Sequence, residues 1–73
     1  MDSRALIIPT EALGKAVFYS KGAKAGMVKS VHVDLYTECL ETIFVSDGKE
    51  DKVFDASDIS FVSEELILLN IPA

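Results

Sequence analysis

The chain has 73 residues, a net charge of −5 from 7 basic and 12 acidic residues, one cysteine and no tryptophan. This length accommodates one small domain, which we expect over residues 1–73 and which buries only ~60–65% of the surface its unfolded chain exposes. A share of 49% apolar residues excludes a disordered tail. The acidic balance argues against direct nucleic-acid binding, because affinity for phosphates comes from clustered Lys and Arg.

The cysteine content and the short apolar runs bear on the cellular compartment. Cys39 has no partner for an internal disulfide, and one thiolate cannot build a metal cage, so we expect a reducing compartment. The longest apolar run near either end covers residues 5–8, far fewer than the ~20 residues of a transmembrane helix or the ~7–15 of a signal segment. We therefore expect a soluble cytoplasmic protein that does not insert into a membrane.

The first predicted element is a short helical turn at residues 10–14. Thr10 can cap its start and Gly14 can end it. Residues 16–19 are rich in strand formers, and two glycines then supply the unusual backbone angles of a turn or bulge at 20–26.

Residues 28–36 alternate between apolar and polar side chains, which is typical of a half-buried strand. The apolar face carries Val31, Val33 and Leu35. After a short connection at 37–39, residues 40–46 form the predicted return strand. One face of this strand carries Ile43 and Val45, and the other carries Leu40, Thr42 and Phe44.

The remainder of the chain contains further turn and strand signals. The dipeptide Asp47-Gly48 indicates a two-residue hairpin loop, and residues 55–58 resemble a capped helical turn with an acidic residue at each end. Three short strands are predicted at 52–54, 59–62 and 66–71. Strands separated by turn signals every ~8–12 residues favour a small barrel or sandwich, so we predict an all-β fold of about six strands.

No constellation of residues predicts catalysis, cofactor binding or metal binding. His32 has no second histidine in the chain to share a metal, and Cys39 stands beside acidic residues that disfavour its thiolate. The segment 22–26 lacks the GxxxxGK[ST] spacing of a phosphate-binding loop. The carboxylates after residue 49 do not have the spacing of a cation-binding loop. We therefore predict a protein that is not an enzyme.

An excess of apolar residues points instead to contact with other proteins. Both faces of the predicted strand 66–71 are apolar, whereas a small barrel buries one face of each strand. Either residues 5–8 or a loop covers the second face, or a partner does. The candidate interface residues are Leu40, Phe44, Leu66, Leu68 and Ile71.

Five short motifs in a fixed order together resemble the PRC-barrel family. The motifs are Leu13-Gly14-Lys15-x-Val17, Lys21-Gly22-x-x-x-Gly26, Val28-x-x-Val31-x-Val33-Asp34-Leu35, Leu40-Glu41-x-Ile43-x-Val45 and Val53-Phe54-x-x-x-Asp58-Ile59, followed by Ile67. The resemblance spans about residues 12–70. Members of this family commonly have glycine where this chain has Glu38, and proline near Asp55.

The resemblance implies a small single-domain β-barrel with one or two short helical turns and no cofactor, as in stand-alone archaeal members. It also implies an adaptor that forms a homodimer or pairs with a related barrel. A role in the archaeal division machinery of FtsZ and SepF is one expectation. The alternative is an accessory factor of the ribosome or of RNA processing, similar to the C-terminal barrel of RimM, which contacts a ribosomal protein.

Overall fold

The computed structural model describes residues 9–73, which form six strands and two 3-10 turns. In chain order the elements are η2 (Pro9–Ala12), β1 (Ala16–Phe18), β2 (Lys24–Val33), β3 (Leu40–Ser46), β4 (Asp51–Asp55), η3 (Ala56–Asp58), β5 (Ile59–Val62) and β6 (Leu66–Leu69). The all-β class is confirmed. The predictions for residues 5–8 lie outside the described residues.

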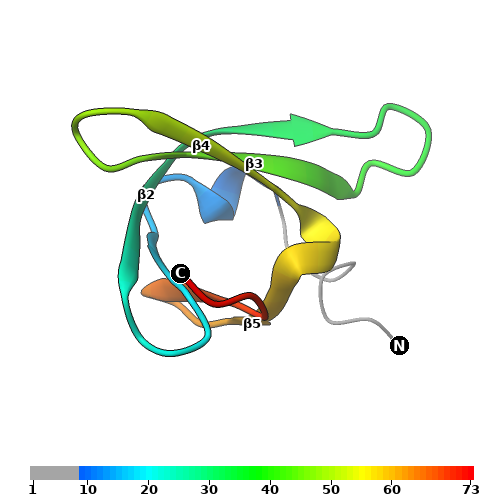
Figure 1. Cartoon of the computed structure of the whole chain (residues 1–73). Coiled ribbons are helices and arrows are strands. Elements are labelled where there is room, and N and C mark those ends of the chain that lie inside the picture. The colour runs from blue at the N-terminus through cyan, green and yellow to red at the C-terminus, as the bar shows by residue number, and fades with distance from the viewer. Residues whose placement is uncertain (1–8) are drawn as a thin grey trace.

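The strands form one sheet in the order β4-β3-β2-β1-β6-β5. All neighbours are antiparallel except β1 and β6, which run parallel. Figure 1 shows the sheet curling into two layers, with β3 and β4 above, β5 below, and β2 rising from one to the other. Within residues 9–73, no hydrogen-bonded pairing joins the edge strands β4 and β5, so the barrel is open at this seam. The chain itself spans the seam through η3.

The curl depends on one glycine within the longest strand. Gly26 lies opposite Val17 in the β1–β2 pair, where the register shifts, and it has a φ of 144°. A β-carbon at this position would lie 2.7 Å from the Ser46 carbonyl carbon and 2.9 Å from Val45 Cγ1. Glycine therefore allows β2 to bend across β3, and this bend directs one face of the sheet inward.

The core lies inside the curled sheet and receives side chains from η2 and from all six strands. Its buried members are Ala12, Val17, Ala25, Val28, Leu40, Ile43, Val45, Phe54, Ile59, Ile67 and Leu69. Side chains fill this interior, as expected for a barrel of this size.

The prediction that β2 continues to residue 36 is wrong. The strand ends at Val33, and Leu35 and Tyr36 are 92% and 98% exposed. The Asp34 side chain ends the strand, because its Oδ1 accepts hydrogen bonds from the backbone N–H groups of Tyr36 (2.7 Å) and Thr37 (3.1 Å). A short polar side chain that satisfies the following amides favours a turn over a strand.

The predicted faces of β3 also need a correction at Leu40. Its side chain is only 5% exposed and belongs to the core, on the side of Ile43 rather than that of Phe44. The register shifts between His32 and Val33, so that Glu41 is an extra residue without a partner on β2. A bulge of this kind reverses the alternation of the residues that precede it.

The other predicted strands and turns are present, with several shifted boundaries: β2 already begins at Lys24, within the turn predicted over 20–26, while η2, β1 and β4 differ from their predicted bounds by one or two residues. Residues 40–46 and 59–62 form strands with the predicted bounds, and the turn before β5 is present. The β3–β4 loop has four residues rather than two, because Asp47 Oδ1 accepts from the N–H groups of Lys49 and Glu50. The last strand ends at Leu69 instead of continuing to residue 71.

Candidate protein-interaction surface

An apolar row crosses the outer surface of β1, β6 and β5. Phe18 pairs with Leu68 in the parallel register, and Leu68 pairs with Phe61 in the antiparallel register. Paired residues project from the same side of a sheet, so the three side chains lie side by side. Phe61 is 56% exposed, and Phe18 and Leu68 are half-buried. The neighbouring pair Val17 and Ile67 projects from the opposite side of the same strands and is part of the core.

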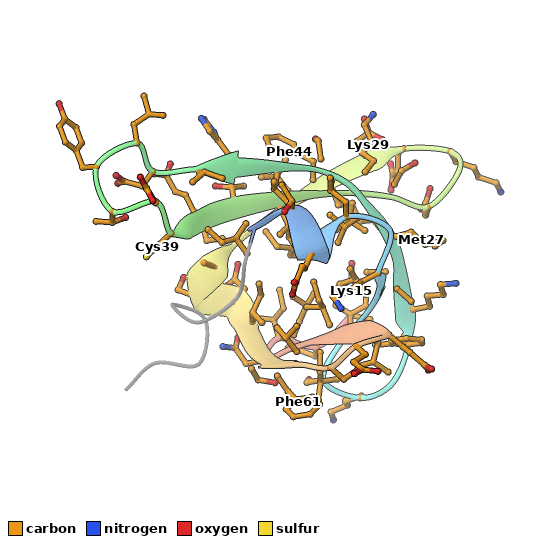
Figure 2. The ribbon with its side chains drawn as sticks, turned by 180° about the vertical axis from the view of Figure 1, so that it is seen from behind. Lys15, Met27, Lys29, Cys39, Phe44 and Phe61 are labelled. Carbon is orange, nitrogen blue, oxygen red and sulfur yellow. The ribbon has the colours of Figure 1, made fainter. Side chains whose placement is uncertain are left out.

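A second row adjoins the first and extends it along the strands. Ala16 pairs with Leu66, and both side chains are half-buried. We name the two rows together the outer apolar face; its members are Ala16, Phe18, Phe61, Leu66 and Leu68. In Figure 2, Phe61 projects away from the barrel on the side opposite Phe44. An apolar surface that spans three adjacent strands is typical of a site of protein contact.

The structure brings together two of the five candidate interface residues. Leu66 and Leu68 belong to the outer apolar face, on alternate positions of β6. Phe44 is half-buried on the other layer beside Val53, which is 57% exposed. Leu40 is in the core, and Ile71 is partly buried against it.

Sequence reasoning missed Phe61, the most exposed member of the outer apolar face. A regular strand over residues 59–62 would place Phe61 on the same side as the buried Ile59. The register of β5 against β6 shifts between these two residues, and the shift turns Phe61 outward. A single sequence contains no clear signal for such a bulge, apart from a serine between two large apolar residues.

Lys15 positions the hairpin that carries one side of this face. Its Nζ donates to the backbone carbonyls of Ser63 at 2.8 Å and Glu64 at 2.7 Å, in the turn between β5 and β6. Figure 2 shows the labelled Lys15 reaching from the start of β1 toward the lower layer. The Ser63 side chain tightens the same turn by accepting from the Leu66 N–H at 3.1 Å.

A groove of about 640 Å³ opens at the bend of β2, beside the β3–β4 loop. It is lined by Gly14, Lys24, Gly26, Met27, Val28, Lys29, Ser46, Asp47 and Gly48. Met27 contributes a side chain that is 48% exposed. The Asp47 carboxylate is held by its loop and lies 3.6 Å from Lys52, while Lys29 contacts Asp51 at 2.6 Å.

The β2–β3 turn, residues 34–39, projects from the other side of the molecule. Hydrogen bonds from the backbone N–H groups of Thr37 and Tyr36 lower the pKa of Asp34 below its ordinary value of 3.8. The Asp34 N–H donates to the Cys39 carbonyl at 3.0 Å, and the Glu38 N–H donates to the Asp34 carbonyl at 2.8 Å. The turn is thus well ordered, although Leu35 and Tyr36 at its end contact almost nothing.

The side chains considered for chemistry do not gather into a site. His32 is exposed on β2, and the Cys39 thiol is half-buried with its Sγ 3.5 Å from the Thr37 carbonyl oxygen. Among residues 9–73, no group of three or more His, Cys, Asp or Glu residues is arranged to hold a metal ion. Over the same range, no helix has the length and apolar character needed to cross a membrane.

Neither a protein-family model nor a curated protein matches this chain.

Proposed function

We propose that this chain is a non-enzymatic interaction module with a fold similar to the PRC-barrel, and that it binds a second copy or a related barrel through the outer apolar face. The observation that carries the proposal is the row Phe18–Leu68–Phe61. Burial of one such aromatic or aliphatic side chain contributes about 1.5–3 kcal/mol, so a small number of them supports a stable contact.

The strand register makes this face suitable for docking. Its members are held on three hydrogen-bonded strands, and Lys15 fixes the β5–β6 turn. A face that is ordered before contact loses little conformational entropy on binding. Together with the expected adaptor role, the resemblance to stand-alone archaeal barrels leads us to propose the FtsZ and SepF division machinery as the setting.

The test compares two exposed apolar residues on opposite layers. Phe61→Ser removes the centre of the outer apolar face, and Val53→Ser is the matched control, since the two side chains are 56% and 57% exposed. We expect Phe61→Ser to weaken self-association, or capture of a related barrel, by about 10–100-fold, as for a central interface residue. Val53→Ser should change it by less than about twofold.

Sedimentation equilibrium measures the self-association, and urea unfolding of both variants verifies that they fold. Equal effects of the two substitutions would contradict the proposed face. A wild-type protein that remains a monomer and captures neither a related barrel nor a SepF-like protein from an archaeal lysate would overturn the proposed function.

A further inference from the structure

The β2–β3 turn presents exposed apolar side chains, and the groove at the bend of β2 offers a concave site of opposite net charge. Leu35 and Tyr36 are the most exposed large apolar side chains among the described residues, and they lie at the end of an ordered turn. The groove presents a concave site with an apolar side chain, Met27. Its volume of about 640 Å³ is in the ~300–1,000 Å³ range of clefts that take small ligands, so an aromatic side chain fits.

The charges of the two sites differ in sign. Residues 30–48 contain no Lys or Arg, and the turn carries the carboxylates of Asp34 and Glu38. The groove is lined by two lysines, Lys24 and Lys29, and by one carboxylate, Asp47. Lys29 is paired with Asp51, and Asp47 lies 3.6 Å from Lys52. Within residues 9–73, Lys24 has no ion-pair partner, so its ammonium is available to an incoming carboxylate. Opposite charges of this kind fix the orientation of a contact and speed its formation.

The turn cannot reach the groove of its own chain. Six residues of β2 separate Met27 from Asp34, which corresponds to about 20 Å along a strand. Figure 2 shows Met27 and Cys39, where the turn joins β3, on opposite sides of the molecule. A contact between these two sites must therefore join two molecules.

We propose that the β2–β3 turn of one copy docks in the groove of a second copy, with Leu35 and Tyr36 against Met27 and the turn carboxylates facing Lys24. Each copy then uses two different surfaces, and the contact repeats in one direction. A head-to-tail contact that does not close on itself generates chains of increasing length. Two apolar side chains and a few charges bury less than the ~1,000 Å² of a stable interface, so each link is weak.

The test uses Phe61→Ser as the parent, so that association through the outer apolar face does not contribute. A turn variant adds Leu35→Ser and Tyr36→Ser, and a groove variant adds Met27→Ser and Lys24→Glu. We expect the parent mass to rise without a plateau between ~10 µM and ~1 mM, the range of a weak contact. The turn and groove variants should each remain monomeric.

A mixture of the two variants provides the decisive measurement. One turn and one groove remain intact in a 1:1 mixture, so the mass should rise to that of a dimer and no further. Raising the salt from ~50 to ~500 mM should weaken this dimer severalfold, because the charges are exposed. Circular dichroism and urea unfolding of each variant verify folding.

The proposal fails if the parent keeps one mass over this range, if either variant alone still associates, or if the mixture remains monomeric. It also fails if the parent stops at a dimer, since that result indicates a symmetric contact. Lys24 and Met27 pair with Phe18 and Ala16 of the outer apolar face, whereas the β2–β3 turn does not adjoin that face. The turn variant therefore separates this proposal from the proposed function, which concerns the loss of association from wild type to the Phe61→Ser parent.

Discussion

Glu38 adopts a backbone conformation that favours glycine. Its φ is 60°, and it is the one non-glycine residue among residues 9–73 with a positive φ. The left-handed conformation costs an L-residue about 1–2 kcal/mol, and glycine avoids this cost. Glycine also increases the conformational entropy of the unfolded chain, which offsets part of the gain in stability. We expect Glu38→Gly to raise the free energy of unfolding by about 0.5–1 kcal/mol.

Urea unfolding measures this gain, and Glu38→Ala is the matched control because it removes the charge but keeps the β-carbon. Only the glycine variant should be more stable. If Glu38→Gly is less stable than wild type, the positive φ does not strain this turn. The positive φ of Glu38 thus gives a physical reason to expect glycine to be favoured at this position.

Asp34 makes the order of the same turn dependent on pH. The N–H groups of Thr37 and Tyr36 lower the pKa of its carboxyl in the folded chain. A lowered folded pKa means that the stabilising contribution is complete above the ordinary pKa of 3.8 and is lost as the pH falls through the folded value. We expect the Tyr36 and Thr37 amide shifts, followed by NMR, to move toward disordered values below pH 3.8.

Asp34→Asn separates the charge from the hydrogen bonds. The asparagine oxygen can still accept from both amides, so the turn should persist without this acid transition. An acid transition of equal size in the Asn variant would assign it to another group.

At the scale of the strand, the bend of β2 depends on the missing side chain of Gly26. A methyl group there would collide with the Ser46 carbonyl group and Val45 in the adjacent strand, and φ is also positive. We expect Gly26→Ala to lower the free energy of unfolding by about 3 kcal/mol or more, since overpacking and backbone strain add.

Gly48→Ala is the control for this experiment. Gly48 also has a positive φ, of 94°, but nothing lies within 4 Å of the position that a β-carbon would occupy. Its cost should therefore be the backbone strain alone, about 1 kcal/mol. Similar losses for the two variants in urea unfolding would show that the close approach of β2 to β3 is not what requires glycine.

The bounds of the strands follow from the sequence more closely than the directions of their side chains. Residues 40–46 have the predicted end because Asp47 and Gly48 are strong turn residues. Residues 59–62 end at Ser63, whose hydroxyl accepts from the Leu66 N–H in the following turn. The directions of Leu40 and Phe61 do not follow, because a bulge beside each reverses the alternation. A bulge is a feature of how two strands pair, and the alternation of apolar and polar residues within one strand does not determine that pairing. Of the five members of the outer apolar face, the sequence therefore predicts Leu66 and Leu68, and the bulge in β5 accounts for the omission of Phe61.

The molecule as a whole has a thin margin of stability. A domain of 73 residues is stable by about 4–11 kcal/mol at ordinary values per residue. Ile67 is fully buried in β6, between the two halves of the sheet. We expect Ile67→Ala to cost about 2–5 kcal/mol, a large share of that margin.

Leu66→Ala removes a half-exposed neighbour on the opposite side of β6 and should cost about 1 kcal/mol or less. Thermal and urea unfolding compare the two variants at low protein concentration, where association contributes little. Equal losses would mean that the outer apolar face supports the fold as much as the core does.

The parallel pairing of β1 with β6 has a consequence for biosynthesis. The ribosome makes β1 long before β6, and the hairpins β2–β3–β4 and β5–β6 can form from neighbouring segments. The two halves join only when β6 has left the exit tunnel and pairs with β1 across about fifty intervening residues. Until then, the nascent chain presents β1 with an unpaired edge, at which a strand of another nascent chain can pair.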